Sequence, residues 1–77
     1  MTRLVFYTTA GCHLCEHAAV LLEELRAERE FEYQAVDISD SETLLEQYGI
    51  RIPVVRNEET GAELGWPFSL EDMSSLF

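Results

Sequence analysis

Residues 4–22 read LVFYTTAGCHLCEHAAVLL, and this stretch decides the fold of the chain. It begins with four apolar residues, passes through a small polar bend and then shows apolar side chains at helical spacing from Leu14 onward. A short apolar run next to threonine and glycine is typical of a buried strand, and the spacing that follows is typical of an amphipathic helix. Both cysteines, Cys12 and Cys15, stand where the bend meets the helix. We therefore expect a strand, a turn and a helix that presents two thiols at its start.

A second strand and a second helix follow the first helix, which we expect to reach about Glu28. Residues 31–38 begin by alternating apolar and polar side chains, the period of two that is typical of a half-exposed edge strand. Ser39 stands three residues before Glu42 and matches a capping box, so we expect the second helix to begin there. Gly49 is placed to end that helix.

The C-terminal third of the chain predicts a hairpin and a last helix. Residues 52–55 read IPVV and form a third strand, whose proline is tolerated at the strand start, and residues 62–64 can pair back after a turn. Ser69 and Asp72 indicate a capped final helix. A strand–helix–strand unit crosses over with parallel strands, and a hairpin is antiparallel. We therefore expect one α/β domain, a four-stranded mixed sheet flanked by three helices in the order βαβαββα.

Composition limits the size of the protein and its partners. At 77 residues, 47% hydrophobic and 26% charged, the chain suits one small globular domain. Fifteen acidic and five basic residues give a formal net charge of -10, which opposes binding to nucleic acids and to anionic membranes. This charge is typical of a well-solvated surface, and steering toward a basic protein partner stays open as a second interpretation.

Hydropathy and cysteine usage indicate the compartment. No apolar run approaches the roughly 18 residues of a membrane span, and the four apolar residues after Arg3 are too few for the core of a signal peptide. We therefore expect a cytoplasmic monomer that binds neither nucleic acid nor membranes. In a reducing compartment, two closely spaced cysteines indicate redox activity or metal binding before they indicate a structural disulfide.

The cysteine spacing suits thiol–disulfide chemistry. The unpaired N–H groups and the partial positive charge at a helix N-terminus favour a thiolate, and Cys12 is placed to receive both. At about 100° per residue, Cys15 lies about 60° around the helix and one turn deeper, close enough for a disulfide. We therefore predict that Cys12 is the attacking thiol and Cys15 the resolving thiol.

Metal binding is the main competing interpretation. A zinc ion or an iron–sulfur cluster needs about four ligands, and His13 and His17 are the available additions to the cysteines. His13 lies about 160° around the helix from Cys15, so we expect no metal site within one chain. A metal or iron–sulfur carrier shared between two chains stays open, as does a merely structural role for two buried cysteines. His13 could also stabilise the Cys12 thiolate or be exposed without a role, and we expect His17 on the surface.

The whole chain resembles the glutaredoxin branch of the thioredoxin-fold proteins. The resemblance rests on residues 6–8, 12–15 and 51–55, and it is strongest with small bacterial glutaredoxin-like proteins that carry a Gly-Cys-His-Leu-Cys motif. It implies one glutaredoxin-like domain over residues 1–77 that acts as a thiol–disulfide oxidoreductase in cell redox homeostasis. The partner would be a disulfide-containing protein or a glutathione mixed disulfide; we expect no bound cofactor, and glutathione could act as co-substrate. A thioredoxin-fold binding module with idle thiols is the remaining alternative.

The resemblance also implies roles for the segment around Pro53. Ile52–Pro53 would be a cis peptide facing Cys12, and the backbone of Ile52 would pair with an extended substrate or with the cysteinyl group of glutathione. Arg51 would lie beside this prolyl loop, where it could face the thiolate or a substrate carboxylate, or it could be an ordinary surface arginine. With His13, these three residues make up the predicted substrate-binding set.

Three departures from the usual glutaredoxin pattern concern glutathione. Thr9 stands where a lysine is usual, His13-Leu14 where a proline and an aromatic residue are usual, and Gly65-Trp66 where two glycines are usual. The sequence therefore supports disulfide chemistry more strongly than it supports glutathione as the substrate. Trp66 could cover one edge of the site, but we expect it to pack against the core.

Overall fold

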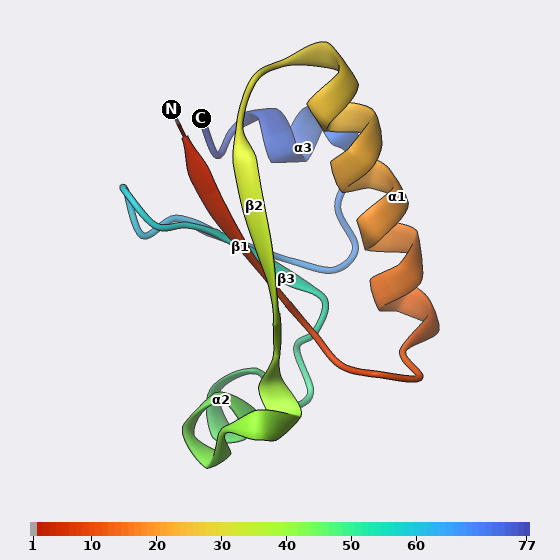
Figure 1. The fold of residues 1–77 in the computed structure, drawn as a ribbon, viewed down its shortest axis with the longest axis vertical. Coiled ribbons are helices and arrows are strands. Elements are labelled where there is room, and N and C mark those ends of the chain that lie inside the picture. The colour runs from red at the N-terminus through yellow and green to blue at the C-terminus, as the bar shows by residue number, and fades with distance from the viewer. Residues whose placement is uncertain (1) are drawn as a thin grey trace.

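Four strands, three α-helices and one short 3-10 helix follow one another along residues 2–77, the part of the chain that the computed structural model describes (Figure 1). In chain order they are β1 (Arg3–Thr8), α1 (His13–Glu28), β2 (Glu32–Asp37), the 3-10 helix η1 (Ile38–Asp40), α2 (Glu42–Tyr48), β3 (Val54–Asn57), β4 (Glu63–Gly65) and α3 (Leu70–Ser74). The predicted order of elements is confirmed.

The strands form one mixed sheet in the order β2-β1-β3-β4. β1 pairs with β2 in parallel, with Phe6 opposite Ala35, and pairs antiparallel with β3, with Tyr7 opposite Val54. β3 and β4 form the predicted antiparallel hairpin. Since β2 has a neighbour on one side only, the expected edge strand is confirmed, and so is the four-stranded mixed sheet with three helices.

The main core lies between one face of the sheet and the helices α1 and α3. Leu4, Phe6 and Val55 of the sheet are buried there, and the helices contribute apolar side chains with almost no exposure, including Leu22 and Met73. Burying a side chain of this size stabilises the fold by about 1.5–3 kcal/mol. These positions recur at helical and strand periods, which is why the sequence pattern identified the elements.

The opposite face of the sheet has a smaller core at one end. Ile38, Tyr48 and Val54 are buried there, and Tyr7 packs against them with its ring stacked on that of Tyr48 at a centroid distance of 4.3 Å. Figure 1 shows α2 at the end of the sheet where β2 finishes, so that this helix caps the end instead of covering the whole face. The start of α1 lies toward the same end (Figure 1).

The start of α2 differs from the prediction. Ser39 does not cap it, because residues Ile38–Asp40 form a 3-10 turn and Ser41 takes the N-cap position, accepting the amide of Leu44 at 3.3 Å. Ser39 instead donates its amide and its hydroxyl to Asp37, at 2.9 and 2.7 Å. Because Asp37 stands only two residues earlier, its carboxylate accepts both donors of Ser39, and the predicted capping box with Glu42 does not form.

Backbone N–H groups explain where the elements of the C-terminal half begin and end. β3 begins at Val54 and not at Ile52, since Pro53 has no N–H and the amide of Ile52 donates to the carbonyl of Tyr48 at 3.1 Å. The capping box at Ser69 is confirmed: Ser69 and Asp72 exchange two hydrogen bonds of 3.0 and 3.1 Å. Gly49 ends α2 as predicted. Within residues 2–77, none of the helices combines the length and the apolar composition that crossing a bilayer requires.

Candidate active site

The turn between β1 and α1 delivers Cys12 to the start of the helix. Gly11 has a φ of 76°, the left-handed region that glycine adopts without the strain other residues meet. A Cβ added there would meet no atom within 4 Å, so the requirement for glycine lies in the backbone and not in space. Cys12 then takes the N-cap position of α1, with extended backbone angles.

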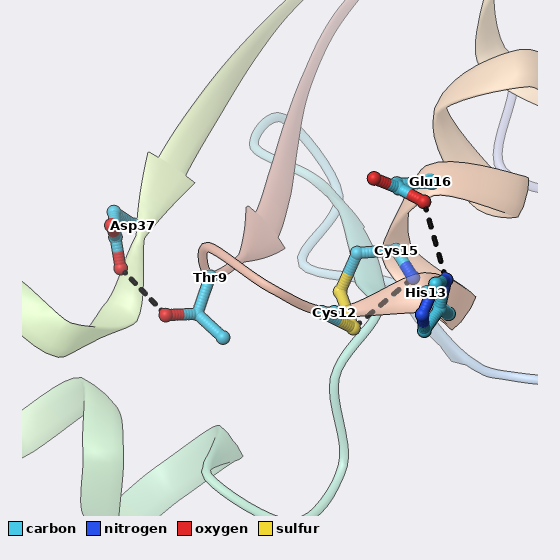
Figure 2. Close-up of a disulfide and its surroundings, with 6 residues drawn as sticks. All are labelled: Thr9, Cys12, His13, Cys15, Glu16 and Asp37. Carbon is cyan, nitrogen blue, oxygen red and sulfur yellow. Dashed lines mark hydrogen bonds and ion pairs between the residues drawn. A yellow bond between two sulfur atoms is a disulfide. The ribbon is translucent and has the colours of Figure 1, made fainter.

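The two cysteines form the predicted disulfide, and their surroundings differ (Figure 2). Their Cα atoms lie 5.2 Å apart, within the range that a disulfide spans. Cys12 is half-buried, whereas Cys15 is only 4% exposed and belongs to the main core. The amide of Cys15 donates to the Sγ atom of Cys12 at 3.1 Å. In the reduced state this N–H and the positive end of the helix dipole would favour a thiolate on Cys12.

Thr9, in the turn before the cysteines, is tied to the end of β2. Its hydroxyl donates to Asp37 at 3.1 Å (Figure 2). The same carboxylate oxygen accepts the two hydrogen bonds from Ser39. These hydrogen bonds, those from Ser39 first, lower the pKa of Asp37 below its ordinary value. Thr9, which occupies the place of a usual lysine, therefore anchors the turn.

His13 and Glu16 form an exposed pair beside Cys12. The His13 side chain is 92% exposed, and its Nδ1 atom lies 3.5 Å from a Glu16 carboxylate oxygen. Figure 2 shows the two side chains pointing toward one another. The His13 ring therefore faces a carboxylate, that of Glu16, in the first turn of α1. His17 is on the surface as predicted, with its ring 6.4 Å from that of Trp66.

The segment before β3 reaches the cysteine end of the sheet through its strand register. Since Val54 lies opposite Tyr7, Pro53 falls near Thr8, at the end of β1 that leads to Cys12. The Ile52–Pro53 peptide bond is cis, Pro53 is buried, and its carbonyl accepts the amide of Trp66 at 3.1 Å. The carbonyl of Tyr48 holds the other side of the segment by accepting the amides of Arg51 and Ile52, at 2.8 and 3.1 Å.

Arg51 is engaged by a carboxylate of β4. Its Nη2 atom lies 3.3 Å from Glu63, and its guanidinium lies 5.3 Å from the centre of the Tyr48 ring. Tyr48 donates its hydroxyl to the other oxygen of Glu63, and this hydrogen bond is the first cause that raises the pKa of Tyr48. The structure therefore brings Arg51 to Glu63 and not to the cysteines. Sequence reasoning missed Glu63, because no local pattern links residues 48, 51 and 63.

Trp66 packs on the core side, as expected. Its half-buried ring contacts the main core and meets Phe68 edge to face at a centroid distance of 5.2 Å. Residues 2–77 hold no group of three or more histidine, cysteine, aspartate or glutamate side chains that could bind a metal ion. Among these residues, the candidate ligands His13 and His17 therefore form no such group with the cysteines.

This sheet order, with a disulfide across the start of the first helix, defines a thioredoxin-like protein. More narrowly, the chain belongs to the glutaredoxin-like domain family (DUF836), which matches residues 3–77. No curated protein matches the chain.

Solved structures show the same fold. The protein XcR50 from X. campestris is 36% identical, with a TM-score of 0.79 over 94% of this chain and 91% of that one. Protein Ne2328 from Nitrosomonas europaea is 29% identical, with a TM-score of 0.83 over 96% of this chain and 88% of that one. A malarial protein shares only 15% identity, with a TM-score of 0.76 over 99% of this chain and 92% of that one, and so shows the fold alone.

Proposed function

We propose that the protein is a thiol–disulfide oxidoreductase in which Cys12 is the nucleophile and Cys15 the resolving thiol. The observation that carries this proposal is that the two sulfurs of the disulfide differ in exposure and in hydrogen bonding. Cys12 is half-buried at the N-cap, and its sulfur accepts the Cys15 amide, whereas Cys15 is 4% exposed within the core. Membership of the glutaredoxin-like family supports the same assignment.

The reaction needs two exchanges of sulfur partners. The Cys12 thiolate attacks a substrate disulfide, so that a bond from Cys12 to the substrate forms, the substrate S–S bond breaks and the leaving thiolate takes up a proton. Cys15 then loses its proton and attacks the Cys12 sulfur, which forms the Cys12–Cys15 disulfide and releases the second substrate thiol. Two electrons pass from the protein to the substrate, and an external thiol, glutathione or a protein dithiol, returns them. The direction of net transfer follows the difference in reduction potential.

The predicted substrate-binding residues take different parts in this proposal. The backbone of Ile52, next to Pro53, receives an extended substrate, since the register of β3 sets this segment against the end of β1. His13 contacts the substrate from the exposed side of Cys12. Arg51 acts through its pair with Glu63, which leaves the guanidinium only partly available for a substrate carboxylate. We propose the cytoplasm as the compartment, where thiol donors keep such pairs reduced.

The test is a redox titration with two cysteine variants. The protein is equilibrated in glutathione buffers of graded potential, free thiols are trapped by alkylation, and the products are counted by mass spectrometry. We expect one reversible two-electron transition. Cys12→Ser should abolish reaction with substrate disulfides, whereas Cys15→Ser should react once and stop as a mixed disulfide. A pair that stays reduced in strongly oxidising buffer, or a Cys12→Ser variant with full activity, would refute the proposal.

A further inference from the structure

The charges around the cysteines are almost all negative. We define the cysteine end as residues 9–16 and 37–53, which the bond from Thr9 to Asp37 and the stacking of Tyr7 on Tyr48 hold together. Its one arginine, Arg51, is already paired with Glu63. The carboxylates of the cysteine end are those of Glu16, Asp37, Asp40, Glu42 and Glu46.

Three of the other four arginines lie away from the cysteines: Arg3 starts β1 at its far end, and Arg26 and Arg29 lie where α1 finishes. Arg56 lies opposite Val5 in the middle of β1, and its guanidinium reaches the hydroxyl of Tyr48. Two of them are paired with glutamates, Arg3 with Glu32 at 3.7 Å and Arg26 with a carboxylate at 3.5 Å. A negatively charged substrate that approaches the cysteine end therefore meets five carboxylates and two guanidinium groups, one paired with Glu63 and the other held at the Tyr48 hydroxyl.

The cysteine end also exposes apolar side chains. Four large apolar side chains among residues 2–77 are exposed, and three of them lie here: Leu14 between the cysteines, Leu45 on α2 and Ile50 before the prolyl segment. Leu14 is 48% exposed, and Ile50 is fully exposed. Exposed apolar groups at the same end of the sheet as a reactive thiol favour a polypeptide with apolar side chains of its own over a small polar thiol.

From these two observations we infer that the substrate is a disulfide within a cationic polypeptide segment that also carries apolar residues. This inference rests on the proposed function and names its substrate class. Complementary charge raises the rate at which two molecules associate, and like charge lowers it. Both effects weaken as the salt concentration rises, because salt screens the two surfaces from one another. Oxidised glutathione carries only carboxylates and amines at its ends, with a net negative charge, and it lacks a large apolar group.

The chemistry stays that of the proposed function. The Cys12 thiolate displaces one cysteine sulfur of the polypeptide disulfide, and that thiolate is protonated. Cys15 then displaces the second, so the polypeptide gains two electrons and two protons while the protein forms its Cys12–Cys15 disulfide. A single turnover of pre-reduced protein therefore needs no additional reductant.

The experiment compares substrates in single turnovers of reduced protein, stopped with acid and read by mass spectrometry. Two peptide disulfides that carry the same apolar residues and differ only in flanking lysines or glutamates are compared with oxidised glutathione and with neutral 2-hydroxyethyl disulfide. We expect the lysine peptide to react about tenfold faster than the glutamate peptide at low salt, and the ratio to fall toward one as salt approaches about 0.5 M. Oxidised glutathione should react no faster than the glutamate peptide.

The possible outcomes distinguish a failure of the substrate inference from a failure of the proposed oxidoreductase function. If no disulfide reacts, 2-hydroxyethyl disulfide included, both the proposed function and the inference are overturned. If 2-hydroxyethyl disulfide reacts but the two peptides react equally, or oxidised glutathione reacts fastest, the inference alone is overturned and the oxidoreductase stands.

Matched variants locate the effect on the surface. Glu42→Gln with Glu46→Gln removes two exposed charges at the cysteine end, and Glu58→Gln with Glu59→Gln removes two exposed charges in the β3–β4 turn. The first pair should lower the lysine-to-glutamate rate ratio about threefold, and the second should leave it nearly unchanged. Equal effects of both pairs would indicate only net charge and would contradict a docking surface at the cysteine end.

The apolar part of the inference has its own variant. Ile50→Ser changes a fully exposed side chain, so it should leave the fold unchanged. It should slow the lysine peptide severalfold and leave 2-hydroxyethyl disulfide unaffected. An unchanged rate with the lysine peptide would overturn the role of this side chain.

Discussion

The cysteine end and the main core use different interactions to hold their parts together. Between the sheet and the helices α1 and α3, buried apolar side chains such as Leu4, Leu22 and Met73 have essentially no exposure. At the cysteine end, hydrogen bonds to Asp37 tie the turn to β2, and bonds to Glu63 tie α2 to β4. The main core therefore stabilises the fold, and the polar contacts of the cysteine end fix where the turn and α2 lie relative to the sheet.

This difference has a consequence for chemistry. A turn that is fixed by a few polar contacts can present Cys12 to a partner, while the apolar core holds Cys15 one helical turn below it. Each hydrogen bond contributes about 1 kcal/mol net, whereas a buried leucine contributes two to five times as much when truncated. Substitutions in the core should therefore lower the free energy of unfolding, and substitutions at the cysteine end should mainly change reaction rates.

Leu22→Ala should show the largest loss of stability. Leu22 is fully buried in the main core, so its truncation should cost about 2–5 kcal/mol, which is a large share of the stability of a domain of this size. Denaturant unfolding measures the loss. The rate constant of Cys12 with 2-hydroxyethyl disulfide, corrected for the folded fraction, should not change. A changed rate constant would show that the core also sets the geometry of the site.

The second prediction uses two tyrosines that each donate a hydroxyl to a glutamate. Tyr48 donates to Glu63 at the cysteine end, and Tyr33 donates to Glu23 of α1 at 2.6 Å. Tyr48→Phe and Tyr33→Phe should each cost about 1 kcal/mol at pH 7, measured by denaturant unfolding. Only Tyr48→Phe should slow peptide disulfide exchange, because the Tyr48 hydroxyl holds Glu63, and Glu63 in turn pairs with Arg51 beside the prolyl segment. Equal kinetic effects would remove the distinction between the two regions.

The same two variants also respond to alkaline pH. The pKa of each tyrosine is raised, that of Tyr48 first by its bond to Glu63 and that of Tyr33 first by burial. A raised pKa in the folded state contributes stability below the unfolded value, about 10, which is lost as pH rises through the folded value. Between pH 9 and 11.5, the free energy of unfolding should therefore depend less steeply on pH in each phenylalanine variant than in the unsubstituted protein. An unchanged slope would show that the hydroxyl is not bound in solution.

Sequence alone predicted what short-range patterns determine. The strand–turn–helix of residues 4–28, the capping box at Ser69 and the proximity of Cys12 to Cys15 each depend on residues within one helical turn or one strand. Their spacing carries the geometry directly, since helices repeat every 3.6 residues and strands every two. Periodicity, capping residues and turn residues also predicted the order of the remaining elements.

Contacts between distant residues could not be predicted in this way. Thr9 and Asp37 are 28 positions apart, and Arg51 and Glu63 are 12 apart, so both pairs depend on the strand register and on where the helices end. The register of a sheet is a property of the whole fold, and these residues acquire their partners only through it. The misplaced cap at Ser39 has a different, local cause, because Asp37 stands two residues earlier and accepts both donors of Ser39.

Asp37→Asn should show the smallest effect and tests the polar anchor directly. Its lowered pKa means that the carboxylate contributes stability above the ordinary value of about 4, and that this contribution is lost as pH falls through the folded value. Asparagine keeps an acceptor oxygen, so the melting temperature at pH 7 should fall only slightly, while its dependence on pH between 2 and 5 should weaken. Asp40→Asn, three residues away and exposed, is the matched control and should preserve that dependence. If both variants weaken it equally, the stabilisation comes from the general acidity of the cysteine end and not from the bonds that Thr9 and Ser39 donate.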